Sequence, residues 1–439
     1  MFDIEENRKK VQRAILIGIQ RSTMSRSEAE YLLEELEELT TNLDIPIVGT
    51  LIVKLRKPQP AFLVGKGKME EILHLVAEHQ ADVLIFDDEL TPAQQRNWEM
   101  ESKIAVIDRQ EVIIDIFSER AQTKEARLQV ELARMEYSLP RLRRAWTHLS
   151  RQRGGMTGAR GQGETQLEAD SRMVRERIAL VKKELDQVIR HRHVQRAKRL
   201  RKPVPTVSIV GYTNAGKSTL LNKLTNSEVL AEDKLFATLD PTTRRLELEQ
   251  SQHVLLTDTV GFVRRLPHRL VEAFKATLEE AIVADLLIHV LDMSNPEVDE
   301  HYETTLQVLS DIEADKNPTL IVFNKVDQPH SPDLLDRLKL VYPSAHFVSA
   351  LTGEGLIELK QAISDSLNAK LRSIELLIPH ERYDVVSRLH QNGGSRTEEV
   401  RDEGVFIEGL FPASLSGVIE PYRFTAYGGV NGSRNEEIE

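Results

Sequence analysis

The residues best suited to chemistry lie in one loop, between a buried-strand pattern at positions 207–210 and a helix pattern at 219–224. The loop consists of Gly211, Tyr212, Thr213, Asn214, Ala215, Gly216, Lys217 and Ser218, and Thr219 follows it. Glycines let the backbone wrap around phosphates, and the amides at a helix N-terminus donate hydrogen bonds to them. Lys217 can bridge the β and γ phosphates, and the Ser218 hydroxyl can ligate Mg2+. This order of strand, loop and helix predicts a site for a nucleoside triphosphate.

A second motif follows the apolar strand pattern at 254–256 and consists of Asp258, Thr259, Val260 and Gly261. Asp258 can hold Mg2+ through a water molecule, and the Gly261 amide can sense the γ phosphate. The motif is common by itself. Its position after a phosphate loop, at the end of a second apolar strand, predicts a γ-phosphate switch.

A third motif, Asn324-Lys325-Val326-Asp327, follows the strand pattern at 320–323 and indicates the base. The Asp327 carboxylate can accept hydrogen bonds from both N1–H and the exocyclic amine of guanine, a donor pair that adenine lacks. Leaving such a carboxylate unpaired costs on the order of several kcal/mol, so the motif predicts GTP in preference to ATP. Lys325 is expected to stack along the base. In the group Ser349, Ala350 and Leu351, a main-chain amide near Ala350 is expected to donate to the guanine carbonyl.

The first switch is expected between residues 225 and 250, in the group Phe236, Ala237, Thr238, Leu239 and Asp240. The Thr238 hydroxyl can reach Mg2+, although Thr242 and Thr243 are alternatives on spacing alone. Phe262 stands where many GTPases have the glutamine that orients the attacking water. We therefore expect catalysis to rest on Lys217, Thr238 and Gly261, with slow hydrolysis until a partner acts.

The composition bounds the kind of protein that holds these motifs. A chain of 439 residues predicts two to four domains. No apolar run approaches the length of a membrane span, and the acidic start does not resemble a secretory signal. Cysteine is absent, which fits a reducing compartment. We expect a cytoplasmic monomer, and a weak association with membranes stays open.

Charge is distributed unevenly along the chain. Residues 141–202 contain 18 Lys and Arg against 6 Asp and Glu, a local charge of +12, whereas the whole chain carries -11. Two helices are predicted at 121–142 and 168–202, joined by a Gly-rich loop at 154–167. Arg151, Arg153 and Arg160 near the loop can contact the phosphates of RNA. The alternatives are a solvated helical face and a flexible hairpin turn.

These patterns predict a multidomain α/β protein. The expected parts are an N-terminal α/β domain at 1–120, a basic helical hairpin with a Gly-rich tip at 121–202, a P-loop GTPase domain at 203–370, and a small α+β domain with a disordered tail at 371–439. The GTPase domain is expected to have a mostly parallel sheet with helices on both faces. The turn Gly65-Lys66-Gly67-Lys68 could bind a phosphate in the first domain, although such a sequence more often forms an ordinary turn without a ligand.

With these motifs the chain resembles the HflX family of translational GTPases, in the wider group that includes Obg. The stretches that carry the resemblance are GQGETQLE at 161–168, VGYTNAGKSTL at 210–220, LFATLDPT at 235–242 and DTVGF at 258–262. The resemblance implies that Thr238 is the switch ligand of Mg2+. It also implies binding to the large ribosomal subunit, splitting or rescue of stalled ribosomes under stress, and insertion of the hairpin tip near the peptidyl-transferase centre.

The sequence departs from the family at the tip, where Gln162 stands in place of a frequent proline. Loss of a residue with a fixed φ predicts a looser tip. Two other functions stay open: a nucleotide-gated adaptor for protein partners, and an additional ATP-dependent or RNA-remodelling activity of the N-terminal domain. Neutralising the hairpin arginines separates the first from ribosome binding, and nucleotide binding by residues 1–120 alone tests the second.

Overall fold

The structure is a computed structural model, and it describes ten ranges of the chain. These are residues 12–145, 160–199, 204–227, 235–248, 253–265, 278–329, 332–368, 371–392, 395–412 and 419–424. The chain divides into two compact units. The first contains residues 1–190, 232–240 and 263–277, and the second contains 191–231, 241–262 and 278–439. The four-part division of the sequence stays a prediction.

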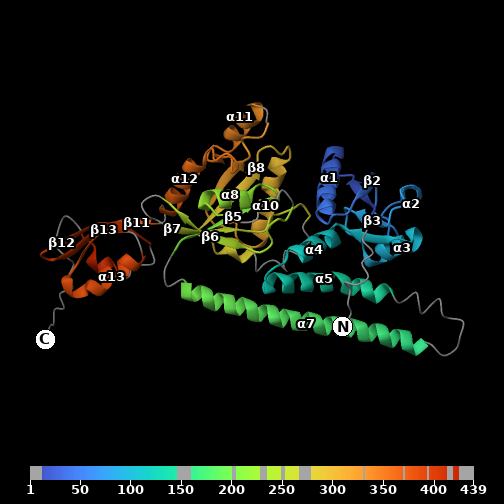
Figure 1. The fold of residues 1–439 in the computed structure, drawn as a ribbon, viewed down its shortest axis with the longest axis horizontal. Helices are drawn as coiled ribbons and strands as arrows, with labels where there is room; N and C mark the ends of the chain where they lie inside the picture. The colour runs from blue at the N-terminus through green and yellow to red at the C-terminus, as the bar shows by residue number, and fades with distance from the viewer. Residues whose placement is uncertain are drawn as a thin grey trace, which may run out of the picture. The chain divides into compact units, whose positions relative to one another are not determined.

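The first unit contains a parallel sheet of four strands, coloured in blues in Figure 1. Its strands are β1 (Ala14–Arg21), β2 (Ile47–Leu55), β3 (Val83–Phe86) and β4 (Ala105–Asp108), in the order β2-β1-β3-β4. The helices that connect them are α1 (Arg26–Asn42), α2 (Lys66–Glu78), α3 (Pro92–Ser102) and α4 (Arg109–Arg120). The sequence patterns predict strands at 47–55, 82–86 and 104–107 but not the central strand β1, although its eight residues are almost all buried.

The sequence pattern predicts a helix at 69–79, whereas α2 begins earlier, directly after Gly65. Gly65 is the N-cap of α2, so Lys66 and Lys68 belong to the first turn of the helix. Lys68 forms an ion pair with Glu71 at 2.6 Å, and Lys66 lies 3.9 Å from Glu70. These lysines therefore have ordinary partners on the helix surface.

The expected helical hairpin corresponds to α5 (Lys124–Ala145) and α7 (Arg160–Arg199). Leu128 and Leu132 of α5 pack against Val181 of α7, and Arg177 pairs with Glu131 at 2.7 Å. Because α7 begins at Arg160, the prediction of a loop through residue 167 is wrong in its second half. Only two glycines fall in this part of the chain. Each destabilises a helix by about 1 kcal/mol relative to Ala, and the residues around them favour a helix. Arg151 and Arg153 lie outside the described residues.

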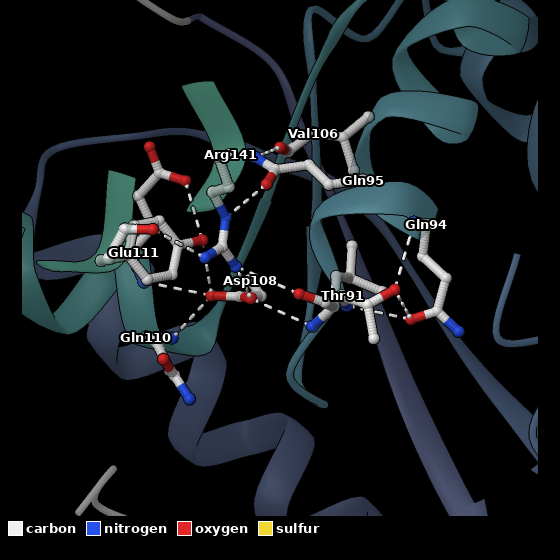
Figure 2. Close-up of polar contacts among 10 residues, drawn as sticks. Thr91, Gln94, Gln95, Val106, Asp108, Gln110, Glu111 and Arg141 are labelled. Carbon is white, nitrogen blue, oxygen red and sulfur yellow. Dashed lines mark hydrogen bonds and ion pairs between the residues drawn. The ribbon is translucent and has the colours of Figure 1, made fainter. Parts of the chain in front are cut away.

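The end of α5 is held on the N-terminal sheet by a polar cluster (Figure 2). Arg141 donates to Asp108 at 3.2 Å, to the Leu90 carbonyl at 3.1 Å and to Gln95 at 2.7 Å. Asp108 is the N-cap of α4 and also accepts from the amides of Gln110 and Glu111. One buried carboxylate therefore joins the start of α4 to the end of α5.

The second unit contains a six-stranded sheet in the order β10-β9-β8-β5-β7-β6, in which only β6 is antiparallel. Its strands are β5 (Thr206–Gly211), β6 (Thr242–Glu247), β7 (His253–Asp258), β8 (Leu286–Asp292), β9 (Thr319–Asn324) and β10 (His346–Phe347). The described helices around it are α8 (Lys217–Thr225), α10 (Val298–Asp311), α11 (Pro332–Val341) and α12 (Leu356–Asn368).

Helices cover both faces of this sheet (Figure 1). Val290 and Val322 face a core that includes α8 and α12, whereas their neighbours Leu291 and Phe323 face a core that includes α10 and α11. Strands buried on both faces are typical of a parallel sheet. The predicted fold class, an α/β protein with a P-loop GTPase domain, is confirmed.

The same unit ends in a three-stranded antiparallel sheet. Its elements are β11 (Leu371–Ile378), η3 (His380–Arg382), α13 (Tyr383–Asn392), β12 (Ser395–Arg401), β13 (Gly404–Pro412) and η5 (Glu420–Tyr422), with the strand order β11-β13-β12. The polar edge strand β12 was not predicted, because it lacks an apolar pattern. The sequence patterns do predict strands at 373–377, 405–410 and 416–419, and the last of these falls mostly outside the described residues. Within the described part of the chain, no helix is long and apolar enough to cross a membrane.

Candidate nucleotide-binding site

The loop after β5 has a backbone that requires glycine at two positions. Gly211 has φ +146°, and a Cβ there would lie 2.2 Å from the Val290 carbonyl oxygen. Gly216 has φ +88°, and a Cβ there would lie 2.3 Å from the side-chain nitrogen of Asn324. Both φ values belong to the region that side chains disfavour. The loop can therefore pass close to β8 and to Asn324 only because these residues are glycines.

Lys217 is the first residue of α8 and is buried. Its Nζ donates to the Tyr212 carbonyl at 2.7 Å, which directs the ammonium group across the phosphate loop. Burial lowers the pKa of Lys217 to about 8, and the charge of Asp258 opposes this effect. The lysine is thus mainly protonated at neutral pH and can interact with phosphate.

Ser218 and Asp258 provide two oxygen atoms at one point of the site. The Ser218 hydroxyl donates to Asp258 Oδ2 at 2.6 Å, and Asp258 is fully buried at the end of β7. The Thr259 hydroxyl donates to the Ile209 carbonyl at 2.7 Å, which fixes the chain after Asp258 against β5. The first two predicted motifs therefore meet beside Lys217.

Gly261 and Phe262 lie directly against the phosphate loop. The Thr213 amide donates to the Phe262 carbonyl at 2.7 Å, and the Phe262 amide donates to the Gly211 carbonyl at 3.1 Å. A Cβ on Gly261 would lie 2.7 Å from Thr213 Cα and 2.8 Å from Lys217 Nζ. The Phe262 ring is fully buried, so it offers no group to a water molecule at the phosphates.

Asn324 connects the third motif to the phosphate loop. Its side chain donates to the Ala215 carbonyl at 2.9 Å and accepts from the Ala350 amide at 2.9 Å. The next residue, Lys325, has φ +68° and forms an ion pair with Asp292 at 2.8 Å. Asp327 is exposed. All of these residues lie at the carboxyl ends of parallel strands, where α/β sheets bind ligands.

The group Ser349, Ala350 and Leu351 follows β10 and forms a tight turn. The Thr352 amide donates to the Ser349 hydroxyl at 3.0 Å, and Ser349 and Ala350 are buried. Leu351 is 69% exposed. The turn holds the Ala350 main chain beside Asn324, and donation from the Ala350 amide to the guanine carbonyl stays a prediction.

Three residues of this region were missed by the sequence analysis. Asp292, the last residue of β8, forms an ion pair with Lys325. Its position as a charged residue at the end of an apolar strand could have indicated a site residue. The His301 ring stacks on Tyr212 at 3.6 Å with an interplanar angle of 4°. His289 is fully buried, and its pKa is lowered to about 3 by burial and by Lys217. Nothing in the sequence pattern distinguished these histidines.

The residues of the predicted first switch fall in different compact units. Phe236, Ala237, Thr238, Leu239 and Asp240 belong to the first unit. The Asp240 carboxylate accepts hydrogen bonds from the main chain at Gln122 and Thr123. The alternative switch threonines, Thr242 and Thr243, belong to β6 in the second unit. Thr242 lies opposite Asp258 in the register of β6 and β7, and the Thr243 hydroxyl lies 2.9 Å from the Thr257 hydroxyl.

A phosphate loop, an adjoining aspartate and glycine motif and a guanine motif on one doubly covered parallel sheet define a P-loop GTPase. Three family models match the chain: GTP-binding GTPase N-terminal at residues 30–118, GTP-binding GTPase Middle Region at 120–199, and 50S ribosome-binding GTPase at 206–325. A GTPase HflX from Akkermansia muciniphila is 46% identical over 96% of this chain and 99% of its own length. The chain belongs to the HflX family of GTPases, and it is a GTP-hydrolysing enzyme.

A second relative agrees with this assignment. GTPase HflX from Escherichia coli is 43% identical over 85% of this chain and 87% of its own length. A solved GTP-binding protein from Sulfolobus solfataricus in complex with GDP is 25% identical, covers 82% of this chain and 99% of its own, and has a TM-score of 0.41.

Proposed function

We propose that Lys217, Ser218 and Asp258 hold the phosphates and Mg2+ of GTP, and that the enzyme acts on the large ribosomal subunit. The observation that carries the first part is the 2.6 Å contact between Ser218 and Asp258 beside the buried Lys217. Asn324, Lys325 and Asp327, with the main chain of Ala350, are proposed to bind guanine. Tyr212, Asn214 and Thr219 complete the set proposed from the phosphate loop.

The oxygen pair of Ser218 and Asp258 fits magnesium. Mg2+ prefers oxygen ligands, keeps several waters and is usually bound by one or two protein groups together with phosphates. Among the described residues no cluster of three or more acidic or histidine side chains is arranged to hold a metal. A serine and one carboxylate beside a phosphate loop suit an ion that the nucleotide helps to bind. Bound Mg2+ would neutralise charge on the phosphates.

Hydrolysis in this proposal needs little chemistry from the protein. Water attacks the γ phosphate in line, the bond to the bridging oxygen breaks, and GDP and phosphate leave. Lys217 compensates the developing negative charge, the Gly261 amide donates to the γ phosphate, and Thr238 completes the site from the first switch. Phe262 is buried and positions no water, so unaided turnover is slow. Activation by a partner in related GTPases reaches roughly five powers of ten.

Ribosome binding is supported by the charge of the hairpin and by the family. Residues 141–202 carry +12 on a chain of net charge -11, and clustered Lys and Arg gain affinity for RNA by counterion release. We propose that Arg151, Arg153 and Arg160 contact ribosomal RNA and that GTP stabilises the bound state, which leads to splitting or rescue of stalled ribosomes.

The test is GTP hydrolysis by the full chain, alone and with purified large ribosomal subunits, with ATP and Lys217→Ala as controls. Stimulation that depends on Lys217 and on GTP supports the proposal. Hydrolysis unchanged by subunits, together with no co-sedimentation in the GTP state, contradicts the ribosome part.

A charge-matched comparison tests the hairpin. Replacing Arg151, Arg153 and Arg160 by Glu should abolish co-sedimentation at physiological salt. The same change at the exposed Arg26, Lys66 and Lys68 alters the net charge equally and should leave most binding intact. If neither triple variant weakened co-sedimentation, a protein partner would be favoured. If both weakened it equally, the attraction would be an unspecific effect of charge.

A further inference from the structure

Residues 235–239 pack closely on the N-terminal domain of the first unit. The Asn42 side chain at the end of α1 donates to the Leu235 carbonyl at 2.9 Å. The Phe236 ring is buried against Phe117 of α4, with ring centroids 4.7 Å apart in an edge-to-face arrangement. Leu239 is buried as well. This segment therefore has a defined receptor surface on α1 and α4.

Asp240 extends this contact to the first helix of the hairpin. Its carboxylate accepts from the amides of Gln122 at 2.9 Å and Thr123 at 3.1 Å, and from the Thr123 hydroxyl at 2.5 Å. Thr123 directly precedes α5, and its hydroxyl also accepts from the Ala126 amide at 3.1 Å. The Thr123 hydroxyl therefore caps α5, and a carboxylate near a helix N-terminus is also favoured by the helix dipole. Asp240 thus holds the capping residue of α5 across 117 residues of sequence.

The segment is also strained in this arrangement. Phe236 has φ +56°, a region that a bulky side chain adopts rarely. Strained backbone persists where surrounding contacts impose it, and such positions concentrate in segments that switch. The buried ring and the Asp240 contacts impose it here.

We infer that Asp240 is a positioning residue that couples the first switch to α5. The inference rests on the proposed role of Thr238, which lies two residues before Asp240. Two residues span at most about 7 Å, so a displacement of Thr238 when it binds Mg2+ is transmitted to the Asp240 carboxylate. In this inference, binding of Mg2+ and GTP by Thr238 releases the strained segment and detaches Asp240 from Thr123, the capping residue of α5. Because such coupling is reciprocal, weakening the contact between Asp240 and Thr123 strengthens GTP binding.

Hydrogen exchange of the full chain tests the first half of this inference. The amides of Ala126 and Arg127, in the first turn of α5, should exchange faster with Mg2+ and a non-hydrolysable GTP analogue than with Mg2+ and GDP. Amides of α13 serve as the internal reference. Equal or slower exchange with the analogue would overturn the coupling.

Affinity measurements test the second half. Asp240→Asn keeps the shape but removes the charge, and Thr123→Val removes the hydroxyl that it contacts. Each should tighten binding of the GTP analogue about threefold to tenfold and leave GDP affinity unchanged. The double variant should show no further gain in affinity for the GTP analogue, because both changes disrupt the same contact between Asp240 and Thr123. Thr41→Val, which removes a hydroxyl bonded within α1, is the matched control and should change neither affinity.

The outcomes separate this inference from the proposed function. If the wild type binds no GTP, or binds it equally well after Lys217→Ala, the proposed site itself is wrong. If binding depends on Lys217 while Asp240→Asn and Thr123→Val alter GTP and GDP affinity equally, the site stands and the coupling is refuted.

Discussion

The side-chain oxygen of Asn324 accepts a hydrogen bond from the Ala350 amide at 2.9 Å, while the side-chain nitrogen donates to the Ala215 carbonyl. One amide thus joins the phosphate loop to the turn proposed to bind guanine. Asn324→Ala leaves two buried main-chain groups unsatisfied, at about 1–3 kcal/mol each. We expect both GTP and GDP affinity to fall at least tenfold, measured by calorimetry.

Asn317→Ala is the matched control for this variant. Asn317 also donates to main-chain carbonyls, those of Ala281 and Ile282, but contacts neither loop of the site. It should lower the thermal stability and leave nucleotide affinity near the wild-type value. A comparable loss of affinity in both variants would show that Asn324 acts only through general stability.

Gly261→Ala should impair the response to the γ phosphate. The added methyl group would lie 2.7 Å from Thr213 Cα and 2.8 Å from Lys217 Nζ, so the main chain must move away from the phosphate loop. We expect GTP hydrolysis to fall at least a hundredfold, with a smaller loss of GDP affinity. Gly67→Ala meets no atom within 4 Å in the first turn of α2 and should leave both unchanged.

Asp327→Asn tests the choice of base. An amide at this position can donate to the carbonyl at C2 of xanthine but no longer accepts from both donors of guanine. We expect affinity for GTP to fall at least a hundredfold and affinity for xanthosine triphosphate to rise. Competition between the two nucleotides measures the change, and an unaltered preference for guanine would remove Asp327 from the proposed site.

Glu111 should make the stability of the first unit depend on pH. The Tyr137 hydroxyl lies 3.0 Å from Asp108 and 3.1 Å from Glu111, yet it has one proton to donate. A proton on Glu111 satisfies the second contact. Burial, followed by the charges of Asp108 and Asp115, raises the pKa of Glu111 to about 7. The cluster around Arg141 and Asp108 is drawn in Figure 2.

Because the folded pKa lies above the unfolded value, this proton stabilises the fold fully below about pH 4.5, and its contribution is lost as pH rises to about 7. The difference amounts to roughly 3 kcal/mol. Glu111→Gln should therefore flatten the stability profile between these pH values and raise the melting temperature at pH 8. The measurement is thermal unfolding across this range, and a parallel profile in both proteins would contradict the assignment.

Much of the nucleotide site could be predicted from the sequence, because each motif is local. A phosphate loop needs its glycines, lysine and serine within eight positions, and its flanking strand and helix are visible as apolar patterns. The order of three such motifs at strand ends then implies that they meet, since parallel strands end at one edge of a sheet. Lys217 and Ser218 are adjacent in the chain, whereas Asp258 lies 40 residues further on and reaches Ser218 because β5 and β7 are neighbours in the sheet.

Other features were decided only by the tertiary structure. Asp292, His289 and His301 reach the site from β8 and α10, and no local pattern distinguishes them from core or surface residues. Asp240 was named as a nucleotide-binding residue, which stays a prediction, and the structure shows its carboxylate holding the residues that precede α5. All of these contacts join residues that are distant along the chain, and their energies depend on packing geometry. The sequence alone determined the chemistry of the local motifs, but the folded chain determined which distant residues hold them in place.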